Sequence, residues 1–215
     1  MREYHKIETV FNRSETGDKK LIEGSFRNDT VEFLKDTKWV WTEKVDGTNI
    51  RIHWDGHKVT FGGRTERAQI PSDLVNYLNN TFATPEAEEL FEQKFADTEV
   101  TLYGEGYGKK IQKVGALYRD DVSFILFDVL IGDVWLRRDS VEDIATAFGI
   151  DIVPICGEGT IEEAIAFIKT SPKSMLSDKA PMEGVVVRPA CELCDRLGRR
   201  VVVKIKVHDF VSGVS

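Results

Sequence analysis

The sequence has no long apolar segment. A membrane-spanning helix needs about 18 or more consecutive apolar residues, and no such run occurs in the chain of 215 residues. Residues 1–6 also lack the apolar core of a secretory signal peptide. We therefore expect a cytoplasmic protein with no membrane partner.

Cysteine is scarce. The three cysteines, Cys156, Cys191 and Cys194, are too few and odd in number for a disulfide framework. Cys191 and Cys194 have the spacing of half a zinc ribbon, but no second pair follows. Only Cys156 and His208 remain to complete four ligands. We favour reduced thiols in a loop, with a structural zinc as the alternative.

Several common catalytic signatures are absent. The chain contains no Gly-x-x-x-x-Gly-Lys-Ser/Thr loop for phosphates. Its four histidines form no Ser-His-Asp or Cys-His arrangement, and we interpret them as surface or packing residues. They are His5, His53, His57 and His208.

The chain has no overall positive charge. With 29 Lys and Arg against 36 Asp and Glu, the formal net charge is −7, which argues against a broad basic face for nucleic acid. A local basic groove remains compatible with this balance. Hydrophobic residues make up 41% and charged residues 30%, so the chain can bury a core, and we expect a single domain, residues 1–215.

Strands dominate the predicted structure. Alternating or continuous apolar runs bounded by turn residues predict them, and Asp-Gly pairs predict the tight turns between the first three. The predicted strands cover residues 39–44, 49–54, 58–61, 99–103, 122–129, 134–136, 184–188 and 200–207.

Four helices are inserted between these strands. Ser72 is predicted to cap the first, and Thr84-Pro85 begins the second. The third runs from Asp139 or Ser140 to Phe148, and the fourth covers residues 160–169. Antiparallel meanders with inserted helices indicate an α+β fold rather than a regularly alternating parallel one.

One stretch combines a strand, a turn and a lysine. Lys44 ends a predicted strand just before the turn Asp46-Gly47, so the sheet would hold its backbone while the amine faces a pocket. Glu43 precedes it and Asn49 and Arg51 follow the turn. The alternative is an ordinary hairpin with a solvated lysine.

A second pair of lysines lies near the end of the chain. Lys204 and Lys206 are two residues apart on a predicted strand, so both amines face one side of the sheet. A solvated strand edge is the alternative. Just before another apolar strand lies Glu183, a carboxylate that would be costly to bury unless it met a cation.

Three further residues have flanks suited to ligand contact. Glu105 follows a strand and lies between two glycines, which allow close backbone approach. Arg64 follows Gly63, and a guanidinium suits phosphate recognition. Phe127 precedes Asp128 in an apolar strand, where a core position is the alternative.

Taken in order, these residues resemble the covalent nucleotidyltransferase superfamily of ATP-dependent DNA ligases, RNA ligases and mRNA capping enzymes. Asn49, at the sixth place of the stretch that begins at Lys44, is similar to the RNA ligase 2 branch. DNA ligases and capping enzymes usually carry Arg there. The resemblance covers nearly the whole chain and implies two antiparallel sheets, flanked by helices, with a nucleotide pocket between them.

The resemblance implies a three-step reaction. Lys44 attacks the α-phosphate of ATP to form lysyl-AMP, AMP passes to a 5′-phosphate end, and a 3′-hydroxyl displaces AMP to seal the strand. Lys204 and Lys206 are implied to contact the α-phosphate and activate the nucleophile. The implied partners are RNA ends, including those of a nicked duplex, in RNA repair, and we expect a monomer.

The resemblance also implies a nucleotide and metal site. The residues expected to bind the nucleotide are Glu43, Asn49, Arg64, Glu105, Phe127, Glu183, Lys204 and Lys206. Phe127 would stack on the purine, Glu105 would contact the ribose, and Arg51 is a weaker candidate to share the task of Arg64. Asp46, Glu105 and Glu183 are expected to hold Mg²⁺ or Mn²⁺ through its water shell.

Other readings stay open. The sequence ends soon after Lys206, whereas most resembling ligases carry a further C-terminal domain, so we expect no accessory domain in this chain. A DNA ligase or guanylyltransferase would use the same covalent step. A non-catalytic module that binds nucleic-acid ends is a rival of another class, and it would form no nucleotide adduct.

Overall fold

The computed structural model describes residues 1–211. They form two compact units, each built from separate parts of the chain. The first unit comprises Met1–His5 and Asp46–Val153, and the second comprises Lys6–Val45 and the described residues from Pro154 onward.

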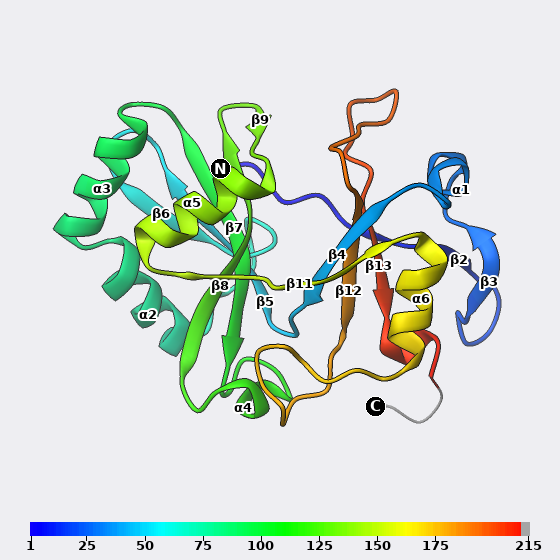
Figure 1. The fold of residues 1–215 in the computed structure, drawn as a ribbon. Coiled ribbons are helices and arrows are strands. Elements are labelled where there is room, and N and C mark those ends of the chain that lie inside the picture. Colours follow the sequence, from blue (N-terminus) through cyan, green and yellow to red (C-terminus); the bar gives the residue numbers. More distant parts are fainter. Residues whose placement is uncertain (212–215) are drawn as a thin grey trace. The chain divides into compact units, whose positions relative to one another are not determined.

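A five-stranded sheet forms the centre of the second unit (Figure 1). Its strands, in spatial order, are β1 (Glu8–Thr9), β13 (Val203–Lys206), β12 (Gly184–Pro189), β4 (Trp39–Lys44) and β11 (Ile155–Gly159). β1 and β13 pair in parallel, and the other pairs are antiparallel. The two lysine-bearing strands, β4 and β13, therefore lie on either side of β12.

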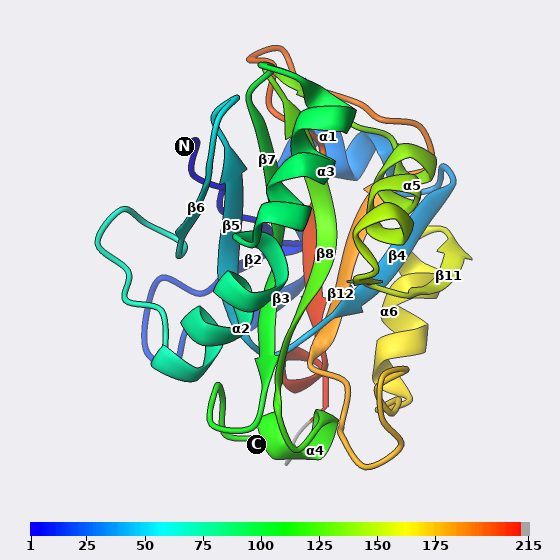
Figure 2. The ribbon, with the colours of Figure 1, turned by 90° about the vertical axis from the view of Figure 1, so that its left-hand side faces the viewer.

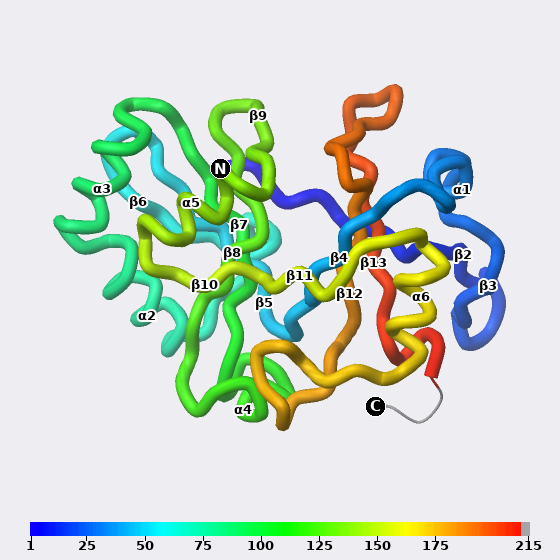
Figure 3. Tube along the Cα trace, in the orientation of Figure 1, coloured from blue at the N-terminus to red at the C-terminus, as the bar shows by residue number. Residues whose placement is uncertain are grey.

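The two faces of this sheet differ. Trp39 and Trp41 are buried and belong to a core that includes Ile165 and Ile168 of α6 (Ile161–Lys169). The alternate residues of β4, Val40, Thr42 and Lys44, are half-buried on the other face. In Figure 3 the chain can be followed from β11 into α6, which begins with a capping box between Thr160 and Glu163.

Three small elements complete the second unit. β2 (Phe11–Arg13) and β3 (Leu21–Phe26) form a two-stranded antiparallel sheet. The helix α1 (Asp29–Leu34) follows β3, with the side chain of Asn28 accepting from the amide of Val31. A 3₁₀ turn, Val207–Asp209, follows β13.

A six-stranded sheet forms the centre of the first unit. Its path is β10 (Asp151–Ile152), β8 (Val122–Ile131), β7 (Val100–Gly108), β5 (Thr48–Trp54) and β6 (Val59–Gly62), and β9 (Val134–Trp135) also pairs with β8. β10 and β8 are parallel, and the other pairs are antiparallel.

Three helices of the first unit pack on this sheet: α2 (Ser72–Phe82), α3 (Pro85–Phe95) and α5 (Arg138–Phe148). Figure 2 shows them on one side of β7 and β8. Leu78, Phe91 and Ile144 join Leu102 and Phe124 of the strands in one core. A short helix, α4 (Gly115–Tyr118), lies between β7 and β8 in the chain.

The α+β prediction is confirmed, with antiparallel sheets flanked by helices. Thr84 caps α3, as expected, and Gly149 ends α5 in the left-handed conformation, with φ 63°. The predicted cap at Ser72 is wrong, because Pro71 takes that place and no side chain bonds the helix end. No helix within residues 1–211 is long and apolar enough to cross a membrane.

Two strand predictions need correction. The strands on either side of Asp46-Gly47 do not pair as a hairpin, because β4 pairs with β11 and β12, whereas β5 pairs with β6 and β7. β7 continues to Gly108, so Glu105 lies within a strand rather than after one. The glycines around it do not end the strand because both neighbouring strands pair with this part of β7.

Candidate active site

Lys44 and Lys206 share one carboxylate. The Nζ atom of Lys44 lies 2.5 Å from Oε2 of Glu183, and the Nζ atom of Lys206 lies 2.6 Å from Oε1. The strand register explains this arrangement, because Gly184, the first residue of β12, pairs with Lys44 on one side and Lys206 on the other. Glu183 therefore enters the sheet between the two lysine strands.

This cluster is only partly accessible to solvent. The side chains of Lys44, Lys206 and Glu183 are 25%, 23% and 17% exposed, respectively. Burial by itself raises the pKa of the Glu183 carboxyl, but the positive charge of Lys44 and hydrogen bonds from both lysines outweigh it. The pKa of Glu183 is lowered overall, so its anionic form binds the two ammonium groups at neutral pH.

Lys204 lies on the same strand face as Lys206. Val203 and Ile205 are buried, whereas the two lysines are half-buried, as the predicted alternation requires. Lys204 pairs with Val186 of β12 and Thr9 of β1. Lys204 and Lys206 also line one open cavity of about 780 Å³.

Glu43 makes a different set of contacts. Its side chain is buried, with a relative exposure of 1%, and its carboxylate accepts from the Ser174 hydroxyl at 2.5 Å and the Met175 amide at 2.8 Å. Burial raises the pKa of Glu43 despite these hydrogen bonds. The described contacts of Glu43 are thus with the segment that leads to Glu183, and its predicted role toward the nucleotide stays a prediction.

Asn49 and Glu105 are direct neighbours in the first unit. They pair across β5 and β7, so their side chains project from the same face. The Oδ1 atom of Asn49 is buried and has no hydrogen-bond partner within residues 1–211. Because a buried acceptor without a partner is unfavourable, this atom is suited to accept a hydrogen bond from a ligand.

The turn that follows Lys44 is closely packed against β7. A Cβ atom at Gly47 would lie 2.3 Å from the Gly106 carbonyl oxygen and 2.7 Å from Cγ of Glu105, so this position requires glycine. The amide of Asp46 donates to the Tyr118 hydroxyl at 3.4 Å. Both contacts position the turn within the first unit.

Phe127 lies at a β-bulge. Tyr103 pairs with Asp128 and Gly104 with Leu126, which leaves Phe127 as the extra residue of β8. Its half-buried ring packs edge-on against Tyr4, with ring centroids 5.1 Å apart. The Tyr4 hydroxyl donates to the buried Asp128 carboxylate, so Asp128 holds an N-terminal tyrosine against β8.

The two arginine candidates have different environments. Arg64 is exposed just beyond β6. Arg51 is 1% exposed and donates from Nε to the Gly63 carbonyl at 2.7 Å. Its Nη1 also donates to Glu66 at 3.2 Å. Arg51 therefore supports the segment that carries Arg64, and does not share its exposed position.

No group of three or more His, Cys, Asp and Glu side chains that could hold a metal occurs within residues 1–211. Mg²⁺ is usually bound by one or two carboxylates together with substrate phosphates and water. The metal-binding role of Asp46, Glu105 and Glu183 stays a prediction. Cys191 and Cys194 are exposed free thiols.

Two sets of residues in the second unit could not be predicted from the sequence. Ser174 and Met175 hold Glu43, but they lie in an irregular segment without a recognisable motif. Lys6, Arg13 and Arg27 line the cavity of Lys204 and Lys206. They are far from those lysines in sequence, and only the parallel pairing of β1 with β13 brings the N-terminal segment beside them.

Comparison with known proteins identifies the family to which this chain belongs. A family model described as RNA ligase matches residues 37–206, a range that includes Lys44, Glu183 and Lys206. Structures of the RNA ligase of Naegleria gruberi are similar in fold. An apo mutant superposes with a TM-score of 0.61 at 19% identity, covering 82% of this chain and 51% of that one.

Two further mutant structures of the Naegleria enzyme contain ligands. One with AMP and Mn gives a TM-score of 0.60 at 20% identity, covering 82% of this chain and 52% of that one. Another, with ATP and Mn, gives 0.62 at 19% identity, covering 95% and 59%. This chain thus spans between 51% and 59% of the length of these three structures. The likeness shows the fold, and because the family model matches most of the sequence, the chain belongs to the RNA ligase family.

Proposed function

We propose that this chain is an ATP-dependent RNA ligase, or its adenylyltransferase part, with Lys44 as the nucleophile. The observation that carries the proposal is the single carboxylate of Glu183 shared by Lys44 and Lys206 on neighbouring strands. In the first step the Lys44 amine forms a bond to the α-phosphorus of ATP. The bond from that phosphorus to the β-phosphate bridging oxygen breaks, and pyrophosphate leaves.

Glu183 and the three lysines have separate roles in this step. Glu183 holds the Lys44 amine at the end of β4, which limits the orientations it samples before attack. Attack requires the neutral amine, so the ammonium of Lys44 first gives a proton to water, which reaches this partly exposed side chain, and the N–P bond forms afterwards. Lys206 and Lys204 supply positive charge for the phosphate oxygens as negative charge moves to the leaving group.

The remaining steps follow from the chemistry of the family. AMP passes from Lys44 to the 5′-phosphate of an RNA end, and a 3′-hydroxyl then displaces AMP to seal the strand, including at a nick in a duplex. The RNA substrate is supported by the family match. The role in RNA repair, the cytoplasmic location and the monomeric state are proposed from the sequence alone.

Residues of the first unit are assigned to the nucleotide. Asn49 offers a buried acceptor, Glu105 is its cross-strand neighbour, and Phe127 presents an aromatic ring at a bulge. Arg64 would contact a phosphate. A divalent ion, Mg²⁺ or Mn²⁺, would be held near Asp46, Glu105 and Glu183 and would neutralise phosphate charge.

The experiment is intact-mass measurement of purified protein after incubation with ATP and Mg²⁺. We expect an AMP adduct on the wild-type protein and none on Lys44→Ala. The matched control is Lys58→Ala, which removes an exposed lysine from the turn before β6 and should leave the adduct intact.

Parallel samples decide among the alternatives. An adduct with GTP but not ATP would indicate a guanylyltransferase. Failure of folded, nucleotide-free protein to form either adduct would contradict the proposal and favour a module that binds nucleic-acid ends. Sealing of nicked RNA compared with nicked DNA, measured with adduct-forming protein, identifies the strand that is joined.

A further inference from the structure

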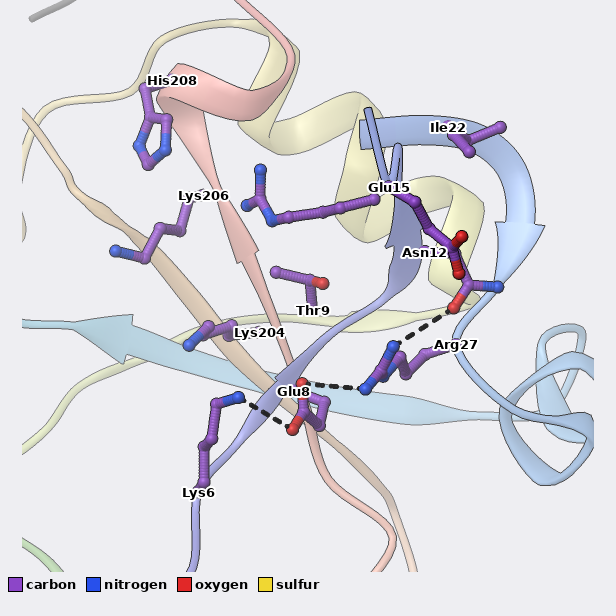
Figure 4. Close-up of a pocket in the computed structure, with 11 residues that line it drawn as sticks. Lys6, Glu8, Thr9, Asn12, Glu15, Ile22, Arg27, Lys204, Lys206 and His208 are labelled. Atoms are coloured by element: carbon purple, nitrogen blue, oxygen red, sulfur yellow. Dashed lines mark hydrogen bonds and ion pairs between the residues drawn. The ribbon is translucent and has the colours of Figure 1, made fainter. Parts of the chain in front are cut away.

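The cavity beside Lys204 and Lys206 is lined by the N-terminal segment of the second unit. Besides these two lysines, its basic lining residues are Lys6, Arg13 and Arg27. Figure 4 shows the amino groups of Lys6, Lys204 and Lys206 following one another along the cavity. Lys6, from the N-terminal segment, therefore extends the row of positive groups that Lys204 and Lys206 of β13 begin.

The lining is positively charged in a protein that is acidic overall. Five basic side chains face two acidic ones, Glu8 and Glu15, in the lining, whereas the whole chain has a formal net charge of −7. Glu8 contacts both Lys6, at 3.2 Å, and Arg27, at 3.5 Å. One carboxylate thus serves two cations, so Glu8 does not neutralise both Lys6 and Arg27.

Arg13 is held in place by a second carboxylate. Its Nη2 atom lies 2.7 Å from both oxygens of Asp209, whose side chain is 4% exposed. Asp209 belongs to the turn directly after β13. The hairpin of β2 and β3 is therefore tied to the lysine strand, and the guanidinium, 35% exposed, is preoriented.

The N-terminal part of this cavity lies outside the range that the RNA ligase model matches, which begins at residue 37. Lys6, Arg13 and Arg27 all precede that range. They extend the site of Lys204 and Lys206, which lie within it. The cavity is thus lined both by β13, which carries Lys204 and Lys206, and by an N-terminal segment that the family model does not match.

We propose that this cavity binds the phosphate backbone of the RNA strand that the protein joins, through Lys6, Arg13 and Arg27. The inference rests on the proposed function for the identity of the strand. Phosphate groups are the ligands that spaced lysines and arginines recognise, and an open groove of this size suits several linked phosphates. The β- and γ-phosphates of ATP are the other source of the same chemistry.

The test measures binding of a short, fluorescently labelled, 5′-phosphorylated RNA by anisotropy over a range of salt concentrations. Arg27→Ala should weaken binding by roughly three- to tenfold and reduce the slope of log K against log salt by about 0.7, the loss of one phosphate contact. Arg27→Lys keeps the charge and should retain most of the affinity. The matched control is Lys20→Ala, which removes an exposed charge from the same hairpin outside the cavity.

Adduct formation from ATP, measured on the same variants, separates the two phosphate sources. The proposal predicts that Arg27→Ala changes RNA affinity more than it changes the rate of adduct formation at limiting ATP. A slower adduct with unchanged RNA affinity would overturn it in favour of the ATP phosphates. Equal RNA affinities of Arg27→Ala and Lys20→Ala would overturn it as well.

Failure of the proposed function is distinguishable from failure of this inference. If the wild-type protein forms no adduct, the ligase proposal fails. Weaker, less salt-dependent RNA binding by Arg27→Ala would then still support a phosphate-binding cavity. If Arg27→Ala proves unfolded by circular dichroism, Lys6→Ala provides the same comparison, because Lys6 is exposed and contacts only the side chain of Glu8 among the ion pairs of residues 1–211.

Discussion

Glu43 and Glu183, both in the second unit, show how different hydrogen-bond partners affect the pKa of a buried glutamate. Glu43, 1% exposed, is held by a hydroxyl and a backbone amide. Glu183, whose side chain is 17% exposed, is held by two ammonium groups. The pKa of Glu43 is raised by burial, whereas the positive charge and hydrogen bonds of the lysines lower that of Glu183 in spite of its burial.

The comparison shows that burial alone does not identify a reactive site. Both carboxylates lose solvent, but Glu183 contacts two positively charged side chains that a phosphate could also bind. Glu43 accepts hydrogen bonds from two neutral donors, the Ser174 hydroxyl and the Met175 amide. We therefore propose that Glu183 takes part in the chemistry and that Glu43 supports the segment around Ser174.

The strongest test of this difference is Glu183→Gln. Loss of the shared carboxylate should misplace Lys44 and reduce the rate of adduct formation by roughly 10²-fold, because small displacements of reacting groups have effects of that size. Single-turnover intact-mass kinetics with ATP measure the rate. The control is Glu158→Gln, which removes an exposed carboxylate of β11. If Glu183→Gln formed the adduct as fast as Glu158→Gln, Glu183 would not position Lys44 for the reaction.

Glu43→Ala should act on stability. The Met175 amide and the Ser174 hydroxyl would lose their acceptor, and leaving such donors unpaired costs about 1–3 kcal/mol of unfolding free energy. Urea unfolding followed by fluorescence measures the loss. Unchanged stability would show that solvent replaces the carboxylate and that Glu43 does not support this segment.

The pH dependence of stability should have opposite signs for the two residues. Because the pKa of Glu43 is raised above its ordinary value of 4.5, the native state retains this proton longer than the unfolded chain. The stability of wild-type protein relative to Glu43→Gln should therefore fall as pH rises above that value.

For Glu183 the expected change of stability with pH has the opposite sign. Its pKa is lowered from 4.5, so its contribution is present above that value and is lost as pH falls through the lowered pKa. Wild-type protein should thus gain stability relative to Glu183→Gln as pH rises. Urea unfolding of the three proteins between about pH 3 and pH 7 measures the slope for Glu183 below pH 4.5 and the slope for Glu43 above it. Two slopes of the same sign would show that one of the two pKa shifts is assigned wrongly.

The smallest expected effect is on Cys156. Burial, with a further contribution from the charge of Glu43, raises the pKa of this thiol to about 12. Since the thiolate is the reactive form, alkylation near pH 8 should modify the exposed Cys191 and Cys194 first. Peptide mass spectrometry follows each site. Glu43→Gln should speed the reaction of Cys156 modestly, and no change would show that Glu43 is not charged there.

Local sequence patterns predicted much of the fold. Alternation located β4 and β13 and placed Lys204 and Lys206 on one face, because burial on one side of a strand repeats every two residues. Thr84 marked the start of a helix through capping chemistry that is local to it. These signals involve residues only a few positions apart.

What the sequence could not predict depends on pairing between distant strands. Glu183 was expected to meet a cation, but its two partners follow from the register of β12 with β4 and β13. The same limit applies to Phe127, whose bulge exists only relative to β7, and to Arg51, whose internal partners come from other parts of the chain.

We propose that Lys44, and not another lysine of the cluster, carries the nucleotide. Peptide mapping of wild-type protein after reaction with ATP and Mg²⁺, under conditions that preserve an acid-labile phosphoramidate, tests this directly. We expect AMP on the peptide that contains Lys44 and no AMP on the peptide that contains Lys204 and Lys206. AMP on Lys204 or Lys206 would contradict it.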